Sequence, residues 1–299
     1  MFARTIAATN WGLNMRLVAF LLVFLTATSV SAEPSATLKP FYSEMQLSGY
    51  LKKISHRYDH RGGGQIETVV VTGSLPSMSI TNNQELGVDE GDIVKLHGNT
   101  LVVLRRGRIF TLSLADGGLA TVDSIASYPP GVDAREDWYD EMLIDGDRVI
   151  VLGYSYGRGG AEINRFHIDA AGHLSFEDAY QLKSDDYYSS RNYATRLIGH
   201  RLILYSPRYL YMADDVLEVM PALRRWNGDK KRPFKRMSTA RRVYPPPPAV
   251  PDDEITSLHT VMSCDVAAPE MTCTATSLFG PDGRTFYVSP RAIYVWVGE

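Results

Sequence analysis

The sequence predicts an all-β fold built from β-propeller blades, each of them an antiparallel four-stranded sheet. This prediction depends on a unit of two apolar strands and a tight turn that recurs along the chain. The turn glycines Gly98, Gly146 and Gly199 are about 50 residues apart, close to the period of about 40 to 50 residues that propeller blades have. The 24 glycines, 16 prolines and 17 tyrosines of the chain also favour strands and turns over a helical bundle.

The repeated unit occurs in four copies. Its paired strands are expected at 92–96 and 101–104, 141–144 and 148–152, 194–198 and 201–205, and 284–288 and 292–296. Outer strands should follow in the first two copies, at 108–114, 119–125, 162–168 and 174–182. The inner strands are nearly continuously apolar and the outer ones are more polar, as expected of sheets stacked around an axis. Because no amphipathic helix of adequate length separates them, a parallel α/β fold is disfavoured.

The chain divides into three parts. They are a signal peptide (1–32), an N-terminal helical extension with a Gly-rich linker (33–75), and about three and a half blades (76–299) interrupted by an insertion (207–253). The extension has a helical spacing of apolar residues at Leu47, Leu51 and Ile54. The insertion is expected to contain a helix from Asp214 to Trp226, followed by a stiff run of four prolines.

The first 32 residues have the pattern of a signal peptide. Arg4 and Arg16 supply positive charge, residues 17–26 form a short apolar core, and small residues precede Ala32. We therefore expect cleavage after Ala32 and export to the periplasm, the cell surface or the medium. The alternative is an uncleaved membrane anchor, but the apolar run is shorter than the roughly 20 residues that a span needs. After cleavage, no membrane span is expected.

The chain has two cysteines, Cys264 and Cys273. In an oxidising compartment they are expected to form one disulfide. Two buried free thiols are the alternative, since two cysteines are too few for a disulfide framework.

The charge balance excludes a general attraction to polyanions. The chain carries 31 basic and 34 acidic residues, and its net charge is -3. No nucleic-acid-binding motif is recognisable either. We therefore expect no nucleic acid partner.

An acidic segment precedes the first inner strand. Its carboxylates Glu85, Asp89, Glu90 and Asp92 should lie on a rim near the central channel. Calcium takes several oxygen ligands from a tight loop, and this spacing could supply part of such a set, although no D-x-D-x-D-G pattern supports it. The interpretation that we favour is structural: the carboxylates accept hydrogen bonds from turn amides and fix the start of the first blade, with Lys95 as a partner. No catalytic residue or metal ligand is assigned.

A second candidate site is a basic run in the insertion. Its cations could bind a protein or an anionic polymer, with Trp226 and Phe234 as stacking surfaces. The alternative is a solvated loop. The residues that we single out for binding are Arg224, Arg225, Lys230, Lys231 and Arg232.

Two further motifs are rejected by their context. Residues 153–157 match G-x-S-x-G, the nucleophile elbow of α/β hydrolases, but the elbow needs a following helix and here another strand is expected. His56 and His60 have a helical metal-ligand spacing but lack the glutamate of H-E-x-x-H, and three glycines follow them closely. A glycine-rich blade loop and a solvated helix end are the favoured interpretations.

The stretch TNNQELGVDEGDIVK, residues 81–95, resembles a known family. It is similar to secreted bacterial and archaeal proteins that carry a C-terminal β-propeller domain distantly related to WD40 repeats. Weaker resemblance covers most of residues 80–299. The resemblance implies an exported propeller, and it implies no catalytic residue. Members of the family are typically longer, so we expect this chain to be a truncated product with an exposed blade edge.

Two functions from different classes fit these features. The first is a non-enzymatic scaffold that presents blade loops and the basic insertion to a protein or glycan partner. The second is an extracellular hydrolase or lyase with its site at the channel mouth. That alternative needs burial to separate the pKa values of Asp89, Glu90 and Asp92, so that they could act as acid and base.

Overall fold

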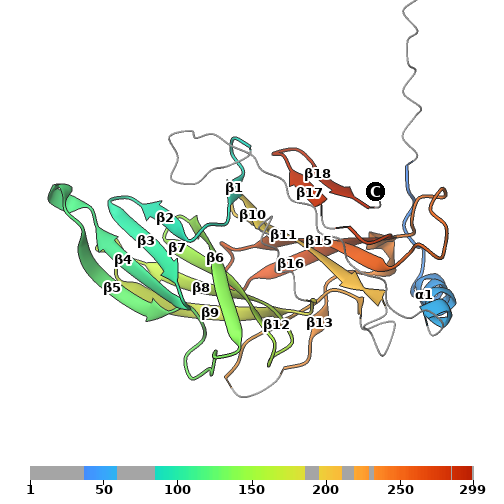
Figure 1. The fold of residues 1–299 in the computed structure, drawn as a ribbon, viewed down its shortest axis with the longest axis horizontal. Coiled ribbons are helices and arrows are strands. Elements are labelled where there is room, and N and C mark those ends of the chain that lie inside the picture. The colour runs from blue at the N-terminus through green and yellow to red at the C-terminus, as the bar shows by residue number, and fades with distance from the viewer. Residues whose placement is uncertain are drawn as a thin grey trace, which may run out of the picture. The chain divides into compact units, whose positions relative to one another are not determined.

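The computed structural model describes residues 37–58, 85–185, 195–210, 219–228, 232–283 and 285–297. In this part of the chain, one α-helix, α1 (Glu44–Tyr58), accompanies strands that form four separate sheets (Figure 1). The predicted all-β class is therefore confirmed. None of the described helices is long and apolar enough to cross a bilayer. The expected signal peptide lies outside the described residues.

Three of the sheets contain four-stranded antiparallel units, which we call blades 1 to 3. Blade 1 consists of β2 (Val94–His97), β3 (Thr100–Arg105), β4 (Arg108–Ser113) and β5 (Ala120–Ala126), paired in that order. Blade 2 consists of β6 (Asp137–Asp145), β7 (Arg148–Ser155), β8 (Gly160–Ile168) and β9 (Leu174–Leu182). Blade 3 consists of β10 (Thr195–Ile198), β11 (Arg201–Tyr209), β15 (Ser257–Asp265) and β16 (Thr272–Gly280).

Shorter strands extend two of these sheets, and a separate hairpin makes up the fourth sheet. A hairpin of β17 (Thr285–Val288) and β18 (Ile293–Trp296) forms the fourth sheet. The strands added to blade 2 are β12 (Ala222–Arg225) and β13 (Lys235–Arg236), and those added to blade 3 are β1 (Asp89–Glu90) and β14 (Val243–Tyr244).

The turn glycines have the conformation that the repeat requires. In each of the three blades the first hairpin closes through two residues, and its first turn residue is the glycine. Gly98, Gly146 and Gly199 have φ values of 55°, 56° and 53°. A two-residue hairpin turn favours positive φ at this position, which glycine adopts without a steric penalty. The same residue type therefore recurs for the same backbone reason.

The blades are stacked face to face, as the alternation along β7 shows. Val149 and Val151 belong to a buried cluster that includes Val102 and Leu104 of blade 1. Ile150 of the same strand belongs to a different cluster, shared with blade 3. Because successive side chains of a strand point to opposite faces, blade 2 is covered on both of its faces.

The stacking continues beyond blade 3. Leu202 and Leu204 of β11 belong to the cluster shared with blade 2. Ile203 and Tyr205 instead belong to a cluster with Phe286 of the β17–β18 hairpin. Sheets that pack successively through both faces are the arrangement of a propeller, and they exclude a single continuous sandwich among the described residues.

The insertion lies inside blade 3, but it begins later than the predicted residue 207, because β11 continues to Tyr209 and β15 begins at Ser257. The helix predicted in it is wrong where the structure describes it. Instead of continuing a helix to Trp226, residues Ala222–Arg225 form strand β12, which pairs with the outer edge of β9. Ala, Leu and Arg have high helix propensity, but an unpaired sheet edge offers backbone hydrogen bonds that override it. The part of the predicted helix at 214–218 lies outside the described residues.

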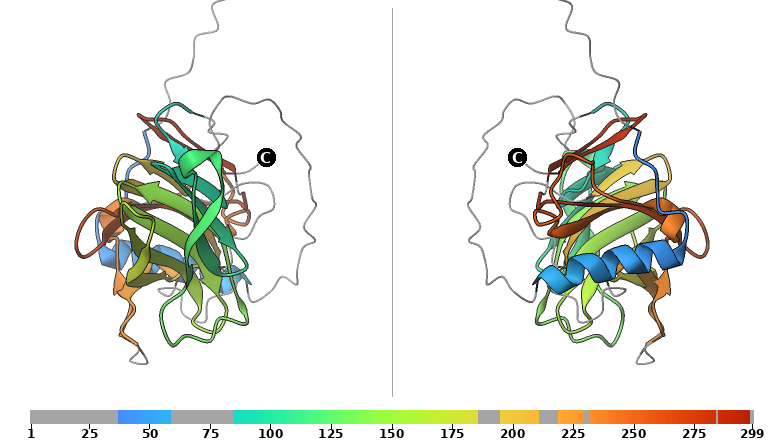
Figure 2. Two further views of the ribbon diagram at one scale, coloured as in Figure 1. Left: turned by 90° about the vertical axis from the view of Figure 1, so that its left-hand side faces the viewer. Right: turned by 90° about the vertical axis from the view of Figure 1, so that its right-hand side faces the viewer.

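Helix α1 confirms the helix predicted in the N-terminal extension. Its buried face, with Leu47, Leu51 and Ile54, belongs to a cluster that contains Phe279 of β16 and residues of the insertion. The backbone N–H of Gln46 donates to Ser43 Oγ at 3.2 Å, the contact of an N-cap. Figure 2 shows α1 lying along blade 3, below its red and orange strands. The helix is therefore part of the same folded unit as the blades.

Candidate functional site

The acidic segment joins the inner edges of three blades. Asp89 and Glu90 form β1, which pairs with β10 of blade 3. Asp92 then exchanges two backbone hydrogen bonds with Met142 of β6 in blade 2, at 3.0 and 2.9 Å. Two residues later the chain begins β2 of blade 1. Residues 89–94 thus pair with the innermost strands of blades 3 and 2 and then begin the innermost strand of blade 1.

The carboxylates of this segment have partners within the protein. Lys95, whose side chain is 5% exposed, donates to Asp89 Oδ1 at 2.7 Å and to the Glu90 carbonyl oxygen at 2.6 Å. The Nε atom of Arg196 lies 3.3 Å from Glu90 Oε1. Asp92 Oδ1 accepts the backbone N–H of Ile93 at 2.6 Å. The contact between the segment and Lys95 is the one expected from the sequence, and it links the carboxylates to the fold.

A carboxylate that was not predicted as part of the site, Glu141, is fully buried beside this segment. Glu141 Oε1 accepts hydrogen bonds from the backbone N–H and the Oγ1 hydroxyl of Thr195. Burial is the largest influence on this carboxyl group and raises its pKa to about 7. A Cβ atom on Gly91 would overlap the Glu141 side chain, which explains the glycine within the acidic segment. A glutamate at the start of the apolar run EMLI was the available signal.

No three His, Cys, Asp or Glu side chains among the described residues gather as ligands for a metal ion. The side chains of His56 and His60 lie outside the described part of the chain.

The G-x-S-x-G match is part of a blade loop. Ser155 ends β7 and is fully buried, and its Oγ atom accepts the backbone N–H of Arg158 at 3.1 Å. Strand β8 begins at Gly160, so no helix follows the serine. Residues 153–157 are therefore not a nucleophile elbow, because a strand follows the serine where the elbow needs a helix.

Part of the basic run lies at the outer edge of blade 2. Arg224 and Arg225 belong to β12. Arg224 Nε donates to Gln181 Oε1 at 2.5 Å, and a guanidinium nitrogen of Arg225 lies 3.3 Å from Asp178 Oδ2. Arg232 is exposed, while Lys230 and Lys231 lie outside the described residues. The structure therefore brings Arg224, Arg225 and Arg232 together around one hollow.

That hollow is a cavity of about 350 Å³, which we call the basic cavity. Five of its lining residues are cationic, and Glu270 is the single carboxylate that lines it. The lining residues are Tyr180, Leu223, Arg224, Arg225, Arg232, Pro233, Lys235, Arg236, Met237, Glu270, Met271, Thr272 and Cys273.

A second cavity adjoins it, because Arg225 and Arg232 line both. This cavity has a volume of about 300 Å³, and we call it the tryptophan cavity. Its other lining residues are Phe176, Glu177, Asp178, Ala179, Trp226 and Asn227.

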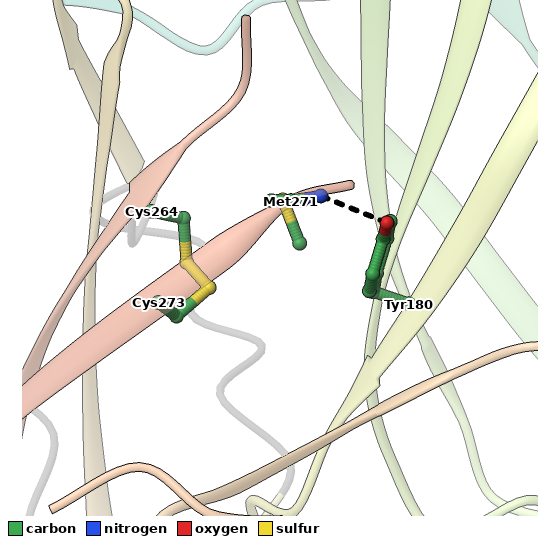
Figure 3. The surroundings of a disulfide bond; sticks show 4 residues. All are labelled: Tyr180, Cys264, Met271 and Cys273. Atoms are coloured by element: carbon green, nitrogen blue, oxygen red, sulfur yellow. Dashed lines mark hydrogen bonds between the residues drawn. A yellow bond between two sulfur atoms is a disulfide. The ribbon is translucent and has the colours of Figure 1, made fainter. Parts of the chain in front are cut away.

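The wall of the basic cavity that blade 3 supplies is fixed by two contacts (Figure 3). Cys264 and Cys273 are directly opposed in β15 and β16 and form a disulfide. The backbone N–H of Met271 donates to the hydroxyl of Tyr180 on β9 at 2.9 Å, which fastens the hairpin to blade 2. The disulfide thus fixes Cys273 within blade 3, and the hydrogen bond holds Met271 against Tyr180 across the two blades.

Arg165, which sequence analysis also missed, anchors the same hairpin. Its guanidinium is 1% exposed and forms two hydrogen bonds of 2.7 Å with Asp178. It also donates to the carbonyl oxygens of Val266, Ala268 and Pro269, which lie in the turn between β15 and β16. Residues 162–168 were predicted as a more polar outer strand, so nothing in the sequence indicated that Arg165 is buried and requires such a set of partners.

Comparison with known proteins identifies the family. A family model described as a beta propeller domain matches residues 78–298. None of the curated proteins and none of the solved structures compared with the chain matches it. The family match covers most of the sequence, including the acidic segment, the three blades and the insertion. This protein is therefore a member of the beta propeller domain family.

Proposed function

We propose that this protein is an exported β-propeller that acts as a non-enzymatic binding scaffold for a protein or glycan partner. The basic cavity at the edge of blade 2 is its contact surface. The observation that carries the proposal is the excess of positive charge there: Arg232 and Lys235 are exposed and have no ion-pair partner among the described residues. Exposed cations held in a concave surface attract an anionic partner.

The contacts of the carboxylates in the acidic segment favour a scaffold over an enzyme. Asp89 and Glu90 contact Lys95 and Arg196, and Asp92 accepts a backbone N–H. Groups tied in this way contribute to stability and are poorly placed to exchange protons with a substrate. Glu141 has the raised pKa of a general acid, but it is fully buried and out of reach of a polymer.

Export is supported by two features of the chain. The first 32 residues have the charge and apolar pattern of a signal peptide. The disulfide between Cys264 and Cys273 suits an oxidising compartment. Expression of the full chain in a bacterium, followed by N-terminal sequencing of the exported fraction, tests this part of the proposal. A mature protein that begins at Glu33 is expected, and retention in the cytoplasm would contradict it.

The binding role is tested with immobilised polyanions. The full chain should be retained on heparin, polygalacturonate or polyglutamate resin and should elute as salt rises, because screening weakens attraction between exposed charges. A variant with Arg232 and Lys235 both replaced by Gln should elute at lower salt. Reducing ends and new double bonds are measured in parallel, since turnover of a polymer by the wild type would favour the hydrolase or lyase.

A further inference from the structure

The basic cavity and the tryptophan cavity adjoin each other at the outer edge of blade 2, and we call the two together the basic groove. They share Arg225 and Arg232 as lining residues, so the two cavities lie next to each other. The volumes of about 350 and 300 Å³ are each at the lower end of the range for small-molecule sites. Together they suit a ligand of two or more small linked units.

The charges within the groove are incompletely balanced by the protein. Arg225 lies beside Asp178, and Arg236 contacts Glu44 of α1 at 2.7 Å. Arg224 donates hydrogen bonds to the Gln181 side chain and to the Arg158 carbonyl oxygen, and the Glu162 carboxylate offsets part of its charge. Arg232 and Lys235 have no ion-pair partner in the described part of the chain, and Glu270 is the single carboxylate that lines the basic cavity with them. An anionic group would restore the balance.

The groove is held ready for a ligand before one arrives. The guanidinium carbon of Arg224 lies 4.3 Å from the centre of the Phe234 ring, and Gln181 fixes its Nε atom. On the opposite wall, the disulfide and the hydrogen bond from Met271 to Tyr180 hold the hairpin of blade 3. A site with few groups left to order loses less entropy on binding.

The walls between the cations are apolar and partly aromatic. Leu223, Pro233 and Met237 line the basic cavity, and Trp226 with Phe176 lines the tryptophan cavity. Rings with an apolar face and polar edges pack well against such walls. Carboxylate and sulfate groups, in turn, accept paired hydrogen bonds from guanidinium groups.

We propose that this groove binds an acidic oligosaccharide, with one sugar ring in each cavity and a carboxylate or sulfate group between Arg232 and Lys235. This inference rests on the proposed function as a binding scaffold and specifies its ligand. An acidic peptide is the weaker candidate, because it has no rigid ring to fill the apolar walls and loses more backbone freedom on binding.

The test uses isothermal titration calorimetry on the full chain with trigalacturonate, its neutral methyl ester, and a sulfated heparin tetrasaccharide. At least one of the acidic sugars should bind, and the methyl ester should not. The double variant Arg232→Gln with Lys235→Gln should weaken that binding at least tenfold. The matched control, Arg241→Gln with Arg242→Gln, removes two exposed cations of the same insertion outside the groove and should leave affinity unchanged.

A third variant tests the second cavity. Trp226→Ala should weaken binding of trigalacturonate and leave the weaker binding of monomeric galacturonate unchanged, because a single ring occupies the basic cavity alone. Circular dichroism and thermal melting confirm that each variant is folded.

Three results would overturn the inference. They are equal losses in the groove and control variants, tighter binding of hexaglutamate than of either acidic sugar, and absence of binding by both acidic sugars. The broader scaffold proposal survives each of them if the protein is still retained on a polyanion resin in a salt-dependent way. Loss of that retention, by contrast, would remove the scaffold proposal itself.

Discussion

Glu141 illustrates at the scale of one residue how a buried carboxyl group makes stability depend on pH. Its pKa is raised to about 7 from an ordinary value of 4.5, chiefly because burial disfavours the charged form. The unfolded chain therefore releases this proton at lower pH than the folded protein does. It follows that the contribution of Glu141 to stability falls as pH rises from about 4.5 to about 7 and is constant above that range.

Replacing Glu141 with Gln should remove this pH dependence while keeping an acceptor for Thr195. Between pH 5 and pH 8 the wild type should lose roughly 2 to 3 kcal/mol more of its free energy of unfolding than the variant does. Urea unfolding followed by tryptophan fluorescence at both pH values measures the difference. Parallel pH profiles for the two proteins would show that Glu141 does not titrate in this range.

Gly91 gives a second prediction at this scale. Because a Cβ atom there would overlap the buried Glu141 side chain, Gly91→Ala should destabilise the protein by roughly 1 to 3 kcal/mol. The matched control is Gly49→Ala in α1, where a Cβ atom meets nothing within 4 Å. That substitution should stabilise the helix by roughly 0.5 to 1 kcal/mol. Thermal unfolding of both variants checks the pair, and equal effects would contradict the steric argument.

At the scale of elements, the sequence predicted the hairpins well because their causes are local. Gly98, Gly146 and Gly199 mark turns whose backbone requires positive φ, and the apolar runs beside them form the expected strands. Strand β12 has a non-local cause, namely pairing with the edge of β9, so its helical composition was misleading. The insertion also separates β11 from β15, which hid that β15 and β16 complete blade 3.

The candidate site shows the same division between local and non-local causes. The carboxylates of the acidic segment and the arginines of the basic run were found because each group is contiguous in the chain. Glu141 and Arg165 were missed because their roles depend on Thr195 and on the β15–β16 turn, which no short stretch of sequence places beside them. The basic cavity itself exists only where three separate segments meet.

The disulfide should stabilise the β15–β16 hairpin chiefly by restricting the unfolded chain. Cys264 and Cys273 are 9 residues apart, and closing so short a loop contributes roughly 2 to 3 kcal/mol. Replacing both with Ala should lower the free energy of unfolding by at least that amount. Adding dithiothreitol should lower the melting temperature of the wild type and leave that of the variant unchanged. Equal melting of oxidised and reduced wild type would contradict this role.

At the scale of the whole molecule, adjacent blades are linked both at exposed turns and through a buried group. His97 Nε2 of blade 1 lies 2.9 Å from Asp147 Oδ1 of blade 2, and His200 Nδ1 of blade 3 lies 2.8 Å from Asp145 Oδ1 of blade 2. Each pair has one partner whose side chain is about 70% exposed. Arg165 instead links blade 2 to blade 3 from a buried position.

This contrast predicts which contact holds the stacked blades together. Arg165→Met keeps the side-chain volume but leaves Asp178 and the carbonyl oxygens of Ala268 and Pro269 without their main donor, so it should cost roughly 3 to 5 kcal/mol. His200→Gln removes an exposed pair and should cost less than about 1 kcal/mol. Urea unfolding compares the two, and a similar slope with urea concentration in each variant would show that the blades still unfold together. If Arg165→Met cost no more than His200→Gln, apolar packing between the sheets would by itself account for the stability of this interface.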